Sequence, residues 1–183
     1  MKQHDRLNNQ KPLKLMLDTN IHDKLHSETA VDESLKRLIR DKKIELITTH
    51  IQQDELAMAP EVTGPESEKI PTEGFILGVS RLGEATLGDG STTKKVPTAG
   101  AVWGVSKWGE ATWGDGSGQG ISVNDIKTDK GNHAKDALIA TTASHHADYL
   151  ITEDKRLLKK LKQLPTKCVV LDFEGLKNLL ANL

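Results

Sequence analysis

The sequence has 183 residues, enough for one well-buried core, and we expect a single domain over residues 1–183. Its 25 Lys and Arg residues nearly balance its 26 Asp and Glu residues, so the formal net charge of -1 gives no general attraction to nucleic acid or a membrane. No apolar stretch approaches the roughly 20 residues that would span a bilayer, and no signal peptide is visible. The lone cysteine, Cys168, lies in an apolar run and is typical of a buried thiol in a reducing compartment. We therefore expect a cytoplasmic protein without membrane contact.

The first part of the chain alternates short apolar runs with segments of helical spacing. Leu13 to Leu17 is too short for a helix and precedes the turn-prone Asp18-Thr19-Asn20, so it predicts a buried strand. The elements predicted after it are a helix over 31–40, a strand over 44–49 and a helix over 51–59 that ends before Pro60.

The same alternation resumes after residue 130. Asn132 can cap a helix over 133–146, and a strand over 149–152 follows. The remaining predicted elements are a helix over 155–164, a strand over 168–171 and a last helix from about residue 174, which Asp172 can cap. Because the strands are apolar on both faces and alternate with helices, they predict the α/β class, with a parallel sheet covered on both sides.

A tandem repeat separates the two halves of the chain. Residues 69–91 and 95–117 are identical at about two thirds of their positions when offset by 26 residues. Glycines recur in both copies and argue against a stable helix, while two copies are too few for a self-sufficient solenoid. We expect a strand near 69–72 and a Gly- and Trp-rich insertion over 69–117 that protrudes as an arm or hairpin.

The second copy carries three tryptophans, Trp103, Trp108 and Trp113, where the first copy has leucines. Such rings can serve as stacking platforms for single-stranded bases. They can also anchor the insertion against the domain or a second subunit. The packing or interface interpretation is favoured, and a homodimer is the expected assembly.

Two of four notable carboxylates directly follow predicted strands. Asp18 and Asp154 thereby lie at the edge of the sheet where ligands bind in open α/β folds. Asn20 and Thr152 stand close to them in the sequence and can support a carboxylate or a bound water. The alternative interpretation of both aspartates is helix capping.

The other two carboxylates lie on predicted helices. Glu55 has the spacing of Ile51 and Met58, which places it within an apolar stripe and leaves Asp54 facing away. Because an unpaired buried carboxylate is costly, Glu55 predicts a cation or a salt bridge. Asp136 heads a second apolar stripe near a helix N-terminus, and its alternative role is to stabilise the helix dipole.

The donor set of Asp18, Glu55, Asp136 and Asp154 contains only oxygen. Without Cys or His at zinc spacing, such a set suits Mg²⁺ or Mn²⁺. Glycine-rich segments do not stand between a strand and a helix start, which excludes the common nucleotide-binding loops. The sequence therefore predicts a hard-cation site in which these four carboxylates are both metal ligands and catalytic residues.

Four segments together resemble the PIN-domain family, which includes the VapC-like toxin ribonucleases of toxin-antitoxin pairs. They are LMLDTN (15–20), ITTHIQQDEL (47–56), NHAKDALIA (132–140) and LITEDKRL (150–157). The resemblance implies a three-layer α/β fold, with a parallel sheet of strand order 3-2-1-4-5 and helices on both faces, and a metal-dependent ribonuclease site.

On this chain the family's acidic ligands match Asp18, Glu55, Asp136 and Asp154. The family's polar supports match Asn20 and Thr152. The repeat departs from the family pattern, because it lengthens the interval between the second and third acidic positions.

We therefore expect an Mg²⁺- or Mn²⁺-dependent endoribonuclease that hydrolyses RNA phosphodiester bonds. It would be the toxin of a toxin-antitoxin pair, with an antitoxin protein as a partner, or a related RNA-processing nuclease. The alternative is a non-catalytic PIN-like module that binds a protein through its Trp-rich arm. The four filled acidic positions argue against the module, and the acidic pair of a receiver-like phosphatase is absent from the first strand.

A basic strip covers residues 155–167, which include no Asp or Glu. Its first members, Lys155, Arg156, Lys159 and Lys160, follow Asp154 directly and are the candidate contacts for the RNA backbone. A solvated cationic helix face is the alternative interpretation of the same residues.

Overall fold

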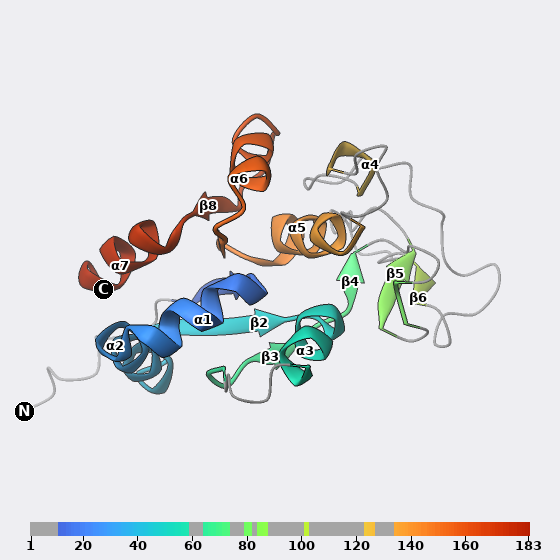
Figure 1. Cartoon of the computed structure of the whole chain (residues 1–183). Helices are drawn as coiled ribbons and strands as arrows, with labels where there is room; N and C mark the ends of the chain where they lie inside the picture. Colours follow the sequence, from blue (N-terminus) through green and yellow to red (C-terminus); the bar gives the residue numbers. More distant parts are fainter. Residues whose placement is uncertain are drawn as a thin grey trace, which may run out of the picture.

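The computed structural model describes residues 11–58, 64–73, 79–81, 84–87, 101–102, 123–126 and 134–183. It is an α/β fold built on a five-stranded parallel sheet flanked by helices (Figure 1). The strands of this sheet, in their spatial order, are β3 (Glu68–Lys69), β2 (Ile44–Thr48), β1 (Leu13–Leu17), β7 (Tyr149–Ile151) and β8 (Val169–Leu171).

Helices cover both faces of the sheet. One face packs against α1 (Thr19–Ser27), α2 (Thr29–Arg40) and α7 (Phe173–Ala181), and the other packs against α5 (Ala134–His146) and α6 (Lys155–Leu161) (Figure 1). Two shorter helices, α3 (His50–Ala57) and α4 (Val123–Ile126), contribute Ile51 and Ile126 to the α5 side.

The apolar core follows from the alternation of side chains along the strands. Met16 belongs to the cluster on the α5 side, whereas its neighbours Leu15 and Leu17 belong to the cluster on the α1 side. Helix α5 is buried without interruption from Ala137 to Ser144, because the sheet covers one of its sides and β4 (Thr72–Glu73) contacts another. The middle of α5 is therefore packed on two sides.

The predicted strands and helices outside the repeat are confirmed, with boundaries that agree within three residues. The short α4 and the helix α1 were not predicted as elements of their own. Asp18-Thr19-Asn20, predicted as a turn, begins α1 instead, and Asp18 is its N-cap. An aspartate can accept a backbone N–H both in a turn and at the start of a helix. The sequence patterns of the two are therefore alike at this position.

The described part of the repeat forms a second, small sheet. Its strands β4, β5 (Ala85–Leu87) and β6 (Ala101–Val102) lie in that order, with a parallel and then an antiparallel pairing. Thr72 and Ala85 are buried, so this part packs against the domain. The rest of the predicted arm, including Trp103, Trp108 and Trp113, lies outside the described residues.

Candidate acidic site at the carboxyl edge of the sheet

Asp18 stands at the centre of the carboxyl edge. Strand β1 pairs in parallel with β7, and the backbone N–H of Asp18 donates to the carbonyl of Ile151 at 2.9 Å. Its Oδ1 accepts the N–H of Thr19 at 2.8 Å, while its Oδ2 accepts from Thr152 Oγ1 at 2.6 Å and from Asn20 Nδ2 at 2.8 Å. Three donors thus hold the carboxylate in one orientation.

The two predicted supports connect Asp18 to the end of β7. Thr152 is fully buried, and its hydroxyl also accepts the N–H of Asp154 at 3.1 Å. Asn20 accepts the N–H of Glu153 through Oδ1 at 3.3 Å. Glu153 itself turns away, since it accepts the N–H of Phe173 and pairs with a lysine of α1. The register of β1 and β7 therefore builds one half of the site.

Glu55 approaches from α3. Its Oε2 accepts the hydroxyl of Thr19 at 2.6 Å, and its Oε1 pairs with Lys135 Nζ at 3.1 Å. The apolar stripe expected to hold it is only partly present, because Met58 is 82% exposed while Ile51 is buried. Helix α3 ends at Ala57, so Met58 lies beyond the last helical turn. Polar contacts, rather than an apolar stripe, place Glu55.

Asp54 is directed away from Glu55, as the helical spacing predicted. Its Oδ1 accepts from the guanidinium of Arg81 at 2.8 Å, outside the acidic site. The two neighbouring carboxylates of α3 therefore have different surroundings.

Asp136 lies in the first turn of α5, where the helix dipole favours negative charge. Its negative charge acts on Asp18 and helps to shift the pKa of that residue. Burial is the largest influence on the pKa of Asp18 and raises it, hydrogen bonds from Thr152 and Thr19 lower it, and the charges of Asp136 and Glu55 raise it again. The net shift is upward, chiefly because of burial, and Glu55 and Asp136 each disfavour the charged form of Asp18.

Asp154 has the contacts of a helix cap. Its Oδ1 accepts the N–H of Arg156 at 2.8 Å and of Leu157 at 3.4 Å, and its Oδ2 lies 3.3 Å from the Arg156 guanidinium. Burial alone would raise the pKa of Asp154, but these hydrogen bonds outweigh it and leave the pKa lowered. The structure connects Asp154 to Asp18 through Thr152, whereas Glu55 and Asp136 influence Asp18 directly.

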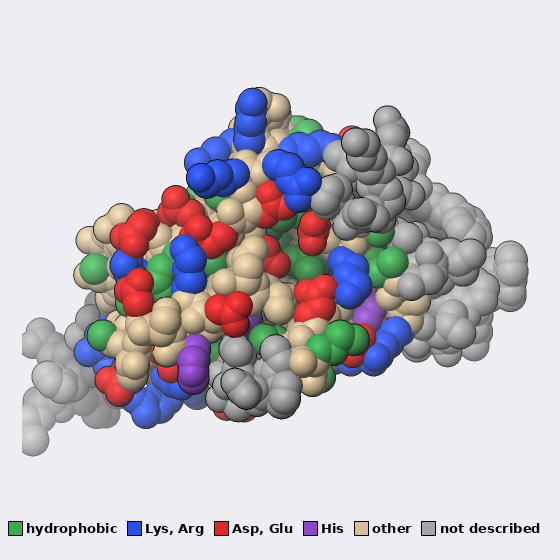
Figure 2. All heavy atoms as spheres, in the orientation of Figure 1, with side chains coloured by type: hydrophobic (Ala, Val, Ile, Leu, Met, Phe, Trp, Pro, Cys, Tyr) green, Lys and Arg blue, Asp and Glu red, His purple; other side chains and the backbone are tan. Residues whose placement is uncertain are grey.

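The predicted basic strip begins beside the acidic group. Lys155, Arg156 and Lys159 of α6 are exposed, and Lys160 donates through Nζ to the carbonyl of Ile126 at 2.8 Å. Figure 2 shows Lys and Arg side chains gathered over α6, next to acidic side chains gathered between α1, α3 and α5. Negative and positive charges are thus adjacent on one face of the molecule.

Three further residues shape the site and were not predicted. Gln52 is buried, donates through Nε2 to the carbonyl of Leu17 at 2.5 Å, and accepts the N–H of Thr49 at 2.9 Å through Oε1. It ties α3 to the end of β1, and the Thr-x-x-Gln pattern of a capping box could have indicated it. Thr19 and Lys135 hold Glu55, and no sequence signal distinguishes them from other surface residues.

The site fits a hard divalent cation in the chemistry of its donors. Asp18, Glu55 and Asp136 supply only carboxylate oxygens, and the ammonium of Lys135 stands in as a cation on one of them. Within the described ranges, however, no three His, Cys, Asp or Glu side chains lie close enough together to form a metal-ligand group. The fit therefore rests on donor type and charge and not on a preformed coordination shell.

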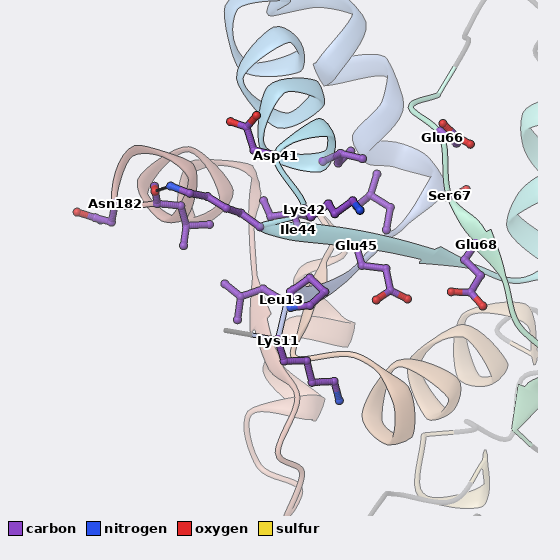
Figure 3. A pocket seen from close by; sticks show the side chains of 15 residues that line it. Lys11, Leu13, Asp41, Lys42, Ile44, Glu45, Glu66, Ser67, Glu68 and Asn182 are labelled. Carbon is purple, nitrogen blue, oxygen red and sulfur yellow. Dashed lines mark hydrogen bonds between the residues drawn. The ribbon is translucent and has the colours of Figure 1, made fainter. Parts of the chain in front are cut away.

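A hollow of about 1120 Å³ lies elsewhere, at the amino ends of β1 and β2 (Figure 3). Its walls mix charges of both signs, such as Lys42 and Glu68, with apolar groups such as Leu13 and Ile44. Because parallel strands place their amino and carboxyl ends at opposite edges, this hollow is separate from the acidic site.

Within the described residues, no helix combines the length and apolar composition needed to cross a membrane.

Comparison of the chain with models of protein families, with curated proteins and with solved structures found no match.

Proposed function

We propose that this chain is an Mg²⁺- or Mn²⁺-dependent endoribonuclease with a PIN-like fold. The observation that carries the proposal is that the charges of Glu55 on α3 and Asp136 on α5 act on Asp18 at the carboxyl edge of a parallel sheet, with Glu55 bonded to the residue that follows Asp18. The sheet order supports the resemblance as well, because its five strands, counted along the chain, run 3-2-1-4-5.

Asp18, Glu55 and Asp136 are the residues that would hold the cation. Thr152 and Asn20 keep the carboxylate of Asp18 in one orientation. A Mg²⁺ or Mn²⁺ ion held by these residues would stabilise the charge that develops on the phosphate as a Lewis acid and would make the attacking water more acidic. Glu55 is the candidate to orient the attacking water and accept its proton.

The positive face beside the site suits the RNA backbone. Lys155, Arg156 and Lys159 project from α6 into solvent and can neutralise successive phosphates. Asp154 fixes the start of α6 and so holds this surface beside Asp18. We extend the proposal to the expected partners, namely an antitoxin protein and a second copy of the chain.

A non-catalytic PIN-like interaction module is the competing proposal. The observation in its favour is that the described carboxylates do not form a three-ligand metal group. The charges of Glu55 and Asp136 beside the partly buried Asp18 favour the nuclease, because a divalent cation offsets more of this negative charge than the single exposed ammonium of Lys135 does.

Cleavage of a labelled single-stranded RNA in Mn²⁺ or Mg²⁺ tests the proposal. Asp18→Asn, Asp136→Asn and Glu55→Gln should each reduce the rate by at least about 100-fold. Asp54→Asn is the matched control for Glu55→Gln, since it neutralises the adjacent carboxylate outside the site and should keep the wild-type rate. Cleavage that survives in all four variants would show that the activity does not come from this site, and no cleavage by wild type would favour the module.

A further inference from the structure

Lys135 joins two of the helices that build the acidic site. It directly precedes Asp136 in the first turn of α5, and its ammonium reaches Glu55 on α3 at 3.1 Å. The second oxygen of Glu55 accepts the hydroxyl of Thr19. Both oxygens of Glu55 therefore already accept a hydrogen bond, and a divalent cation that approaches Glu55 competes with these partners for the carboxylate.

Lys135 is the partner that a divalent cation displaces more readily. Its side chain is 51% exposed, and an exposed lysine pair contributes little to stability because water and salt screen it. The ammonium sits on a flexible four-carbon stem and keeps most of its hydration when it moves. Thr19, by contrast, lies at the start of α1, beside the cap that Asp18 forms.

We propose that Lys135 is a built-in counter-ion that competes with the divalent cation for Glu55 and, when displaced, binds a phosphate of the RNA. This inference rests on the proposed nuclease function and deepens it. The competition links the two ligands, since a cation at Glu55 releases the positive charge that the substrate then uses.

The charges of the site give the reason for such a device. Three carboxylates within one another's field repel, and the ammonium of Lys135 offsets part of that repulsion. It also repels a divalent ion that approaches the same oxygens. Once the ion is bound, the displaced ammonium still lies beside the carboxylates. It is therefore placed to bind a phosphate that approaches the ion.

Binding of Mn²⁺ alone, measured by calorimetry without RNA, tests the first half. Lys135→Met should bind Mn²⁺ about fivefold more tightly than wild type. Lys36→Met is the matched control, since Lys36 pairs with Asp32 at 2.6 Å on α2, away from the site, and should leave the affinity unchanged. In a Glu55→Gln background the effect of Lys135→Met should disappear, which a general effect on folding would not do.

The outcomes separate this inference from the nuclease proposal. If wild type binds Mn²⁺ and Lys135→Met binds it equally or less well, the counter-ion role is overturned and the cation site stands. If neither protein binds Mn²⁺, the cation site itself is overturned.

RNA cleavage at saturating Mn²⁺ tests the second half. Lys135→Met should raise KM several-fold and reduce the salt dependence of log KM by about one phosphate contact. Lys135→Arg, which keeps the charge, should restore both quantities. An unchanged KM and salt slope in Lys135→Met would overturn the phosphate contact.

Discussion

Replacing Gln52 with alanine should both unfold the chain more easily and loosen the acidic site. Gln52 is 1% exposed, and its amide joins the carbonyl of Leu17 to the N–H of Thr49. Alanine leaves these two backbone groups without the side chain that bonds them. Because Leu17 precedes Asp18 and Thr49 starts the helix that carries Glu55, the same bonds fix one carboxylate relative to the other.

The expected loss of stability follows from those two contacts. A buried backbone group that loses its partner costs about 1–3 kcal/mol, so for two groups we expect Gln52→Ala to lower the free energy of unfolding by about 2–6 kcal/mol. With a urea dependence of about 2 kcal/mol per molar, the unfolding midpoint should fall by about 1–3 M. That loss is a large part of the 5–15 kcal/mol typical of a domain.

Urea unfolding followed by circular dichroism measures this change. Gln53→Ala is the matched control, because the neighbouring Gln53 is exposed and should shift the midpoint by less than about 0.3 M. Equal midpoints for the two variants would refute the reasoning that the Gln52 amide joins β1 to α3.

Three further predictions concern groups away from the acidic site. An added methyl at Gly64 would lie 2.8 Å from the ring of His22, so Gly64→Ala should cost about 1–3 kcal/mol in urea unfolding, and a neutral result would contradict that close contact. Burial is the main cause that lowers the pKa of His22, so the folded chain binds fewer protons there than the unfolded chain. Its contribution to stability is present above about pH 6.5 and lost as the pH falls. The urea midpoint should therefore drop more between pH 7 and pH 5 in wild type than in His22→Asn, and equal drops would contradict the shift. Burial raises the pKa of the Cys168 thiol to about 12, so a thiol reagent at pH 8 should label it at least about 100-fold more slowly in the folded chain than in urea, and rapid labelling of the folded chain would disprove this.

The sequence was sufficient to predict the main sheet because its strands are short, apolar and bounded by turn or cap residues. Each of the strands β1 and β7 is followed by a residue, Asp18 or Thr152, whose side-chain oxygen accepts a nearby backbone N–H. Helix α1 was harder to predict, since Asp18 and Asn20 suit a turn and a helix start equally well. The parallel pairing of β1 and β7 then places the ends of both strands at the same edge of the sheet.

The acidic site was predictable only in part, because the contacts that complete it span long distances in the chain. The spacing along α3 indicated that Glu55 and Asp54 face different ways, and the structure agrees. The same spacing predicted that Met58 is buried, and this prediction is wrong because the helix ends before Met58 and its side chain is exposed. Lys135 bonds a residue 80 positions away, and a single sequence carries no signal for such a pair.

The first copy of the repeat contacts the two helices that carry Glu55 and Asp136. Arg81 pairs with Asp54 on α3, and the buried Glu73 contacts α5, where its N–H donates to Thr142 Oγ1 and its Oε1 lies 2.8 Å from His146 Nε2.

The Arg81–Asp54 pair is exposed and contributes little, so the buried Glu73 makes the contact that attaches this copy to the domain, and it does so at α5. The second copy keeps a basic residue, Lys107, at the position of Arg81 but has Ala99 at the position of Glu73. Alanine has no carboxylate to offer the histidine of α5. The contact between Glu73 and His146 therefore depends on a residue that the second copy lacks.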